Sequence, residues 1–149
     1  MKNFRVQFFL IALAFVTVFS ACKKDDAPGA KPKTTAEKVV GKWNIKKTTI
    51  RTYVDEDLFD TEEDNGVAGD YVEFNNNKTY VSFTKDDGLD SGSYEILNES
   101  SMTITMDGDK LTAKVEKLDE KEFTFTSTFS ETDDDGTNYK VVATFELAK

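Results

Sequence analysis

The segment Phe123-Thr124-Phe125-Thr126-Ser127-Thr128-Phe129 places aromatic side chains at every second position for most of its length, with hydroxyl side chains between them. Successive side chains of a β-strand point to opposite faces, so this period of two predicts a strand with one buried and one solvated face. The same alternation recurs on both sides of the segment. It predicts eight strands, at residues 42–54, 70–75, 79–84, 92–97, 101–106, 110–118, 122–131 and 138–147.

The connections between these strands are mostly short and carry turn-forming residues. Asp107-Gly108 is the clearest of them, because both central residues of a tight hairpin turn adopt positive φ angles. Hairpins that follow one another without a helix favour a meander, and an eight-stranded meander closes best into a barrel without an open edge. The sequence therefore predicts an all-β, eight-stranded antiparallel up-and-down barrel, with a β-sandwich as the alternative.

Two local signals refine the start of this barrel. The capping-box pair Thr34 and Glu37 predicts a short N-terminal helical turn that ends at Gly41. In the first strand, the apolar positions change phase from Ile45 to Ile50. This change predicts a β-bulge between these two residues that bends the strand around the barrel.

The first 21 residues have the layout of a secretory signal. Lys2 and Arg5 precede an apolar run at residues 8–16, which is too short to span a bilayer as a mature helix. Phe19-Ser20-Ala21-Cys22 then resembles the lipobox of bacterial lipoproteins, in which the cysteine is acylated. We expect three segments: a signal peptide at 1–21, a flexible tether at 22–33 and a barrel domain at 34–149.

The residues after Cys22 bear on localisation. Lys23-Lys24-Asp25-Asp26 resembles the short signal that sends some Gram-negative lipoproteins to the outer face of the outer membrane. Several acyl chains on Cys22, as the lipobox resemblance implies, give stable anchoring where one chain gives only marginal binding. We expect an exported protein, lipid-anchored in the outer membrane and exposed on the cell surface. A solvated start of the tether is the alternative interpretation of the charged residues.

Gly41-Lys42-Trp43 leads from the predicted helical turn into the first strand and resembles the G-x-W motif of the lipocalins. The similarity in strand pattern covers about residues 34–149, and it implies a ligand-binding barrel whose closed end Trp43 plugs. The family also stacks an arginine from its last strand on this tryptophan and places a long helix after the barrel. This chain has no arginine in its last strand, so it resembles the compact lipocalin-like domains of bacterial lipoproteins.

Composition excludes several kinds of chemistry. The chain has no histidine and one cysteine, so it has no histidine-activated nucleophile, no histidine-ligated metal and no internal disulfide. Its formal net charge of −9 disfavours nucleic-acid binding, which depends on neutralising phosphates with Lys and Arg. We expect a monomer that is not an enzyme. A hydrolase that uses two carboxylates is the remaining catalytic alternative.

Acidic residues are concentrated at one end of the predicted barrel. Alternate connections of a meander lie at the same end, and those at 55–69, 85–91, 107–109 and 132–137, with flanking residues, hold 17 of the 28 acids and one lysine. An acidic mouth repels anions and attracts cationic ligands, basic protein surfaces or Ca²⁺. The spacing of Glu131, Asp133 and Asp135 partly matches a calcium loop, so these are the candidate metal ligands. Solvated loops that keep the protein soluble are the alternative.

These observations favour a lipid-anchored binding module for a small, non-anionic ligand. No cofactor is expected apart from Ca²⁺, and the ligand is expected to be hydrophobic or cationic. The alternative is a filled barrel that presents its acidic loops to a partner protein or to Ca²⁺. In strand 79–84 we expect Val81 and Phe83 to face inward, and we expect residues 55–69 to form a loop that covers the pocket. The candidate pocket residues are Tyr94, Met102, Phe125, Tyr139 and Val141.

Replacing the cysteine tests the anchor. In Cys22→Ala the acyl acceptor is absent, so we expect the protein to leave the membrane fraction and appear in the soluble fraction. Fractionation followed by immunoblotting measures this, with Ser20→Ala as a variant of the same segment that keeps the cysteine. Unchanged membrane retention of Cys22→Ala would refute lipidation.

Overall fold

The computed structural model describes residues 32–149, which form one compact unit. The predicted signal peptide, Cys22, the charged residues after it and most of the tether lie outside these residues. No helix within residues 32–149 is long and apolar enough to cross a membrane.

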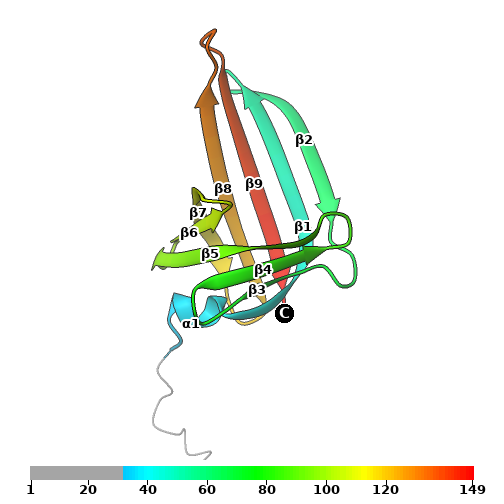
Figure 1. The fold of residues 1–149 in the computed structure, drawn as a ribbon, viewed down its shortest axis with the longest axis vertical. Coiled ribbons are helices and arrows are strands. Elements are labelled where there is room, and N and C mark those ends of the chain that lie inside the picture. Colours follow the sequence, from blue (N-terminus) through cyan, green and yellow to red (C-terminus); the bar gives the residue numbers. More distant parts are fainter. Residues whose placement is uncertain (1–31) are drawn as a thin grey trace, which may run out of the picture. The chain divides into compact units, whose positions relative to one another are not determined.

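One short helix and nine strands make up the described residues (Figure 1). They are α1 (Thr35–Val39), β1 (Gly41–Val54), β2 (Asp57–Asn65), β3 (Tyr71–Phe74), β4 (Thr79–Thr84), β5 (Gly88–Asn98), β6 (Ser101–Met106), β7 (Asp109–Leu118), β8 (Glu122–Thr132) and β9 (Asn138–Ala148).

The strands form a closed antiparallel barrel. From β3 to β9 each strand pairs with the next in sequence, and β9 returns to pair with β1 from Asn44 opposite Ala148 to Val54 opposite Tyr139. β3 and β2 lie one after the other along the second edge of β1, so together they fill one position of the barrel. The closed eight-stranded barrel is therefore confirmed, and the sandwich is excluded.

Residues 55–69 are not the loop that the sequence predicted. Asp55 and Glu56 adopt positive φ angles of 49° and 72° and make a tight turn, after which β2 runs back along β1. The pattern in β2 escapes detection because every second residue is acidic rather than apolar, and the whole strand is exposed. It is held by backbone pairing with β1, so the predicted lid is instead an edge of the sheet.

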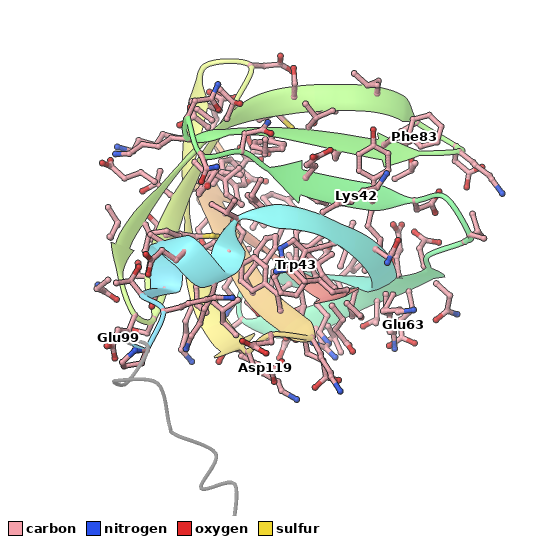
Figure 2. The ribbon with its side chains drawn as sticks, turned by 90° about the horizontal axis from the view of Figure 1, so that it is seen from below. Lys42, Trp43, Glu63, Phe83, Glu99 and Asp119 are labelled. Atoms are coloured by element: carbon pink, nitrogen blue, oxygen red, sulfur yellow. The ribbon has the colours of Figure 1, made fainter. Side chains whose placement is uncertain are left out.

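The side chains of β4 face the opposite way from the prediction. Phe74 pairs with Tyr80 across the β3–β4 hairpin, which turns Tyr80 inward and places Val81 and Phe83 on the outer surface. Outside the barrel, the Phe83 ring stacks on Tyr71 at a centroid distance of 6.0 Å. Figure 2 shows Phe83 and Lys42 away from the central Trp43.

Three other local predictions are confirmed. Thr34 caps α1 together with Glu37, as the capping box requires. The register of β1 against β9 shifts between Ile45 and Lys47, which is the predicted bulge. Asp107 and Gly108 both have positive φ, at 52° and 96°.

Four strands continue past the closed barrel as a sheet that we call the extension. β7 pairs with β8 only as far as Ser127, and β3 pairs with β1 only as far as Asn44. Beyond these points the sheet consists of β8, β9, β1 and β2, which rise past β3, β4 and β5 in Figure 1. β2 and the end of β8 are the two edges of the extension.

Gly92 provides a test of the core packing. The Tyr80 side chain lies over Gly92 on the inside of the barrel. A Cβ added at Gly92 would lie 2.7 Å from the Tyr80 ring and would overlap the Thr105 carbonyl oxygen. We expect Gly92→Ala to lower the free energy of unfolding by about 1–3 kcal/mol through overpacking. Urea unfolding measures this, and Ser93→Ala at the exposed neighbouring position is the control. Equal stabilities of the two variants would contradict this packing.

Candidate functional site

Trp43 closes the end of the barrel next to α1. Its side chain is completely buried, and its indole N–H donates to the carbonyl of Val39 at 2.7 Å. Gly41 before it has a φ of 119°, a conformation that favours glycine. Figure 2 shows Trp43 beside α1 at the centre of this end. The G-x-W residues therefore join the helix to the first strand.

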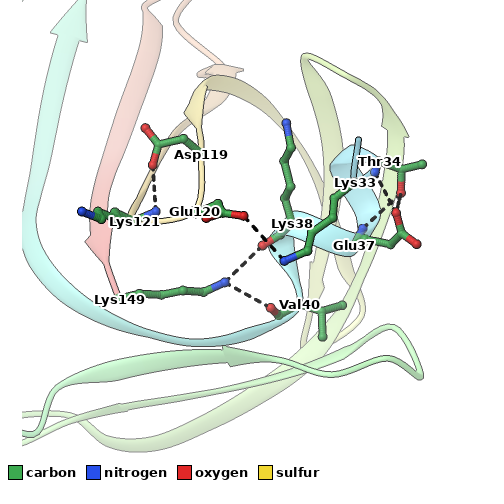
Figure 3. Close-up of polar contacts among 9 residues, drawn as sticks. All are labelled: Lys33, Thr34, Glu37, Lys38, Val40, Asp119, Glu120, Lys121 and Lys149. Carbon is green, nitrogen blue, oxygen red and sulfur yellow. Dashed lines mark hydrogen bonds and ion pairs between the residues drawn. The ribbon is translucent and has the colours of Figure 1, made fainter. Parts of the chain in front are cut away.

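A lysine supplies the cation over Trp43 that the lipocalin resemblance leads us to expect from an arginine. Lys149, directly after β9, holds its Nζ 4.1 Å from the centroid of the Trp43 ring. The same Nζ donates to the carbonyls of Lys38 and Val40 at 3.4 Å each (Figure 3). The last strand carries no arginine, yet the cation over the tryptophan is present.

Aromatic side chains fill the barrel interior above Trp43. Phe123 lies between Trp43, Phe74 and Phe125, with ring centroids 5.5, 5.8 and 5.1 Å away. Phe125 in turn stacks on Phe145 at 4.9 Å. These contacts continue from the closed end to the start of the extension, so the closed part of the barrel is packed with its own side chains.

The structure separates the five predicted pocket residues into two groups. Tyr94, Met102 and Phe125 belong to the packed core, and the Tyr94 hydroxyl donates to the carbonyl of Asn75 at 2.9 Å. Tyr139 and Val141 lie further along β9, in the extension. The five residues therefore do not line one pocket.

The extension continues the inward-facing side of the barrel as a partly open surface, which we call the inner face. Phe125 pairs with Phe145 in the core, and four residues further along β8 the pair is Phe129 with Val141, on the same side of the sheet. Phe129 is 48% exposed, whereas Phe125 is buried. The side chains of the inner face are mostly apolar, and Ser127 and Glu131 are polar members on β8. The others are Ile50, Thr52, Val54, Phe129, Tyr139, Val141 and Ala143.

Carboxylates border the inner face along β2. Pairing with β1 places four acidic side chains of β2 on the same side of the sheet as Ile50 and Val54. We call them the carboxylate row: Asp57, Asp60, Glu62 and Asp64. None of the ion pairs within residues 32–149 involves the row. The inner face is thus an apolar strip with unneutralised negative charge along one side.

The opposite side of the extension carries paired charges. Lys47 and Glu63 form an ion pair at 2.8 Å, and Lys140 and Glu56 form another at 2.7 Å. Lys140 also lies 4.6 Å from the centroid of the Tyr53 ring. Lys47 and Lys140 are therefore engaged away from the inner face.

The candidate calcium ligands do not form a cluster. Within residues 32–149, no group of three or more acidic side chains is arranged to hold a metal ion. Asp135 accepts hydrogen bonds from Thr137 in the β8–β9 turn, which lower the pKa of its carboxyl group. Asp133 accepts from the N–H of Asp134. Both carboxylates serve the turn, and Glu131 lies on the inner face opposite Tyr139.

A groove of about 280 Å³ lies at the α1 end, between the helix and β7. Lys33, Lys38, Glu99, Glu116 and Lys117 are among the residues that line it. Charges of both signs alternate around it, and Figure 3 shows Lys33 directed at Glu120. The lining of this groove therefore carries charge of both signs.

The comparison with known families agrees with this geometry. A family model described as a lipocalin-like domain matches residues 39–125. The chain belongs to the lipocalin-like domain family. No curated protein matches the sequence. The lipocalin-like match begins at Val39, which accepts the hydrogen bond from Trp43, and it ends at Phe125 in β8.

Several residues of this lipocalin-like domain were not identified from the sequence as parts of the site. Ile50, Thr52 and Val54 were assigned to a strand without a role, although they line the inner face. The sequence assigns the residues of the carboxylate row to the acidic mouth, but in a predicted loop. Acidic residues at every second position from Asp60 to Asp64 are the usable signal for a strand there. Lys149 had none, since its place above Trp43 follows from barrel closure.

Tyr80 gives the barrel a predictable pH dependence. Burial, with Asp90 and Asp107 nearby, raises the pKa of the Tyr80 phenol above its usual value. The phenol therefore stays neutral in the folded state at a pH where it ionises in the unfolded state. Stability from this group is complete below the unfolded pKa of about 10 and is lost as the pH rises through the folded pKa.

We therefore expect the free energy of unfolding to fall above about pH 10, and to fall less steeply in Tyr80→Phe. Urea unfolding between about pH 8 and pH 11 measures both slopes, and the values at the lower pH correct for any change in packing. Identical slopes for the two proteins would contradict the assignment.

Proposed function

We propose that this lipocalin-like domain is a lipid-anchored binding module outside the cytoplasm that takes a small, non-anionic, largely apolar ligand on its inner face. The observation that carries the proposal is the inner face itself. It continues the packed core as an apolar surface, and Phe129, on the edge strand β8, is half exposed. Covering such a surface with an apolar ligand is favourable by roughly 25 cal/mol per Å² of area removed from water.

The packed interior supports this location over the middle of the barrel. Trp43, Phe74 and Phe123 are fully buried, and the Phe123 ring contacts both of the others. A ligand at that depth would have to displace them, which costs the packing energy of several aromatic rings. Ligand binding at the mouth needs no such change.

The carboxylate row supports the choice of ligand charge. Its four side chains have no cationic partner among residues 32–149, so an anionic headgroup placed on the inner face would be repelled. A neutral or cationic amphiphile can place its apolar part against Val141 and its polar end near Asp60 or Glu62. Fatty acids and other anions fit this face poorly.

The proposed lipid anchor and cellular location are inferred from the sequence that precedes the barrel. The signal-like segment at 1–21, the lipobox-like residues that end at Cys22 and the charged residues after it all support export, acylation and an outer-membrane location. The tether at 22–33 would then connect the membrane to the barrel.

A second candidate function is the presentation of acidic residues to a partner protein. The carboxylate row and the acidic turns favour it, since charge of this kind attracts basic surfaces. Catalysis has less support, because lipocalin-like domains generally bind ligands rather than catalyse reactions.

Titration with a neutral apolar dye, N-phenylnaphthylamine, tests the proposal. We expect saturable fluorescence enhancement with a soluble chain that begins at Lys23, since residues 32–149 form a compact unit. Phe129→Ala should weaken dye binding about tenfold, because it removes part of the roughly 1.5–3 kcal/mol that a buried Phe contributes.

Leu89→Ala is the matched control. Leu89 is 71% exposed on the outer surface of β5, in line with Phe83, so its removal should leave the dye affinity unchanged. Equal losses in the two variants would place the dye elsewhere. Absence of any saturable site, or tighter binding of dodecyl sulfate than of the neutral dye, would overturn the proposal.

A further inference from the structure

β2 has one free edge. Its nine residues pair only with β1, so among residues 32–149 no strand lies on its other side. The N–H of Gly66, just after β2, donates to the carbonyl of Lys46 in β1, whereas the N–H of Thr61 donates to the side chain of Asp60 at 2.8 Å. Backbone groups alternate in direction along an antiparallel strand, so those of Thr61, Glu63 and Asn65 point to the free edge.

The two sides of β2 differ in how their charges are satisfied. On the outer side, Glu63 pairs with Lys47 and Thr61 lies opposite Arg51. On the inner side, the carboxylate row has no cationic partner among the described residues. The uncompensated charge therefore follows the free edge on one side only.

The charges of β2 decide which strand can pair with this edge. The strand contains five acidic residues and no basic residue. Antiparallel pairing of β2 with β2 of a second copy would bring like charges opposite one another, which is destabilising. Charges on an edge strand commonly prevent such self-association. The same charges favour a strand that carries Lys or Arg.

We propose that the free edge of β2 is a docking site for an extended basic segment of another protein. The segment adds to the extension as a further strand, with its amides and carbonyls bonded to those of Thr61, Glu63 and Asn65. Lys or Arg at every second position then lies over the carboxylate row. This site shares the carboxylate row with the ligand site on the inner face, but it adds the free backbone edge of β2 and takes a different class of partner.

The dimensions of β2 define the partner segment. Alternate residues of a strand are about 6.6 Å apart, so basic residues at positions i, i+2 and i+4 match Asp60, Glu62 and Asp64. Phe59 is the extra residue of a bulge between Leu58 and Asp60, and it is 77% exposed. An apolar residue at the corresponding end of the segment would cover Phe59.

A nine-residue peptide of alternating Thr and Lys tests the docking site. Fluorescence anisotropy of the labelled peptide, titrated with the chain that begins at Lys23, should show saturable binding that weakens as salt is added. A second peptide of the same sequence is N-methylated at the alternate residues whose N–H groups would face β2. It keeps every charge but cannot donate backbone hydrogen bonds to β2. Its affinity should be at least about tenfold lower, because the backbone hydrogen bonds are lost.

A matched pair of double variants separates the effect of the carboxylate row on peptide binding from the effect of net charge. Asp60→Asn with Glu62→Gln and Glu56→Gln with Glu63→Gln each remove two negative charges, from the unpaired row and from the paired outer side respectively. The first should weaken peptide binding about tenfold and the second less than about threefold. Thr61→Pro should also abolish binding, since it removes a free-edge N–H and leaves the pairing with β1 intact.

Three outcomes would overturn the proposal. Equal affinity of the two peptides would show that charge alone attracts them. Equal effects of the two double variants would show that the carboxylate row contributes no more than other acidic residues. Absence of saturable binding would show that β2 has no docking site. Phe129→Ala, which weakens dye binding in the function proposed above, should leave peptide binding unchanged. The two proposals can therefore fail independently.

Discussion

The pairing of β1 with β9 is the constraint on which the rest of the structure depends. It joins the first strand to the last, so it converts a meander with two open edges into a barrel and buries the aromatic side chains that line its interior. It also places Lys149 above Trp43, although these residues lie at opposite ends of the folded chain. Because β1 is longer than the strands it pairs with on its other edge, the same pairing continues into the extension and supports β2.

The extension explains why a filled barrel can still present a binding surface. A side chain on the inward side of β8 is buried at Phe125, where β7 and the far wall are present, and exposed at Phe129, where β7 no longer pairs with β8. The apolar pattern is the same at both positions. What differs is the presence of an opposing wall, so the mouth of this barrel behaves as an open sheet rather than as a cavity.

The sequence was sufficient where polarity and periodicity agree. Phe123 and Phe125 alternate with threonine, and their strand and its buried face are as predicted. In β4 both faces carry apolar residues, so alternation alone could not choose between Tyr80 and Val81. The choice follows from pairing with Phe74 and from the space that Gly92 leaves.

β2 was missed because its alternation is between acidic residues on one side and Thr or paired acids on the other. The five predicted pocket residues fall into two groups because periodicity identifies the inward side of β9 but not where the opposing wall ends, which separates Val141 from Tyr94.

Closure through β9 also has a kinetic consequence. Contacts between the first and last strands carry the largest sequence separation in the domain, and folding slows as contacts become more distant in sequence. Until β9 has been made and is free to pair, the edges of β1 and β8 that it occupies have no partner, so closure of the barrel waits for the last strand.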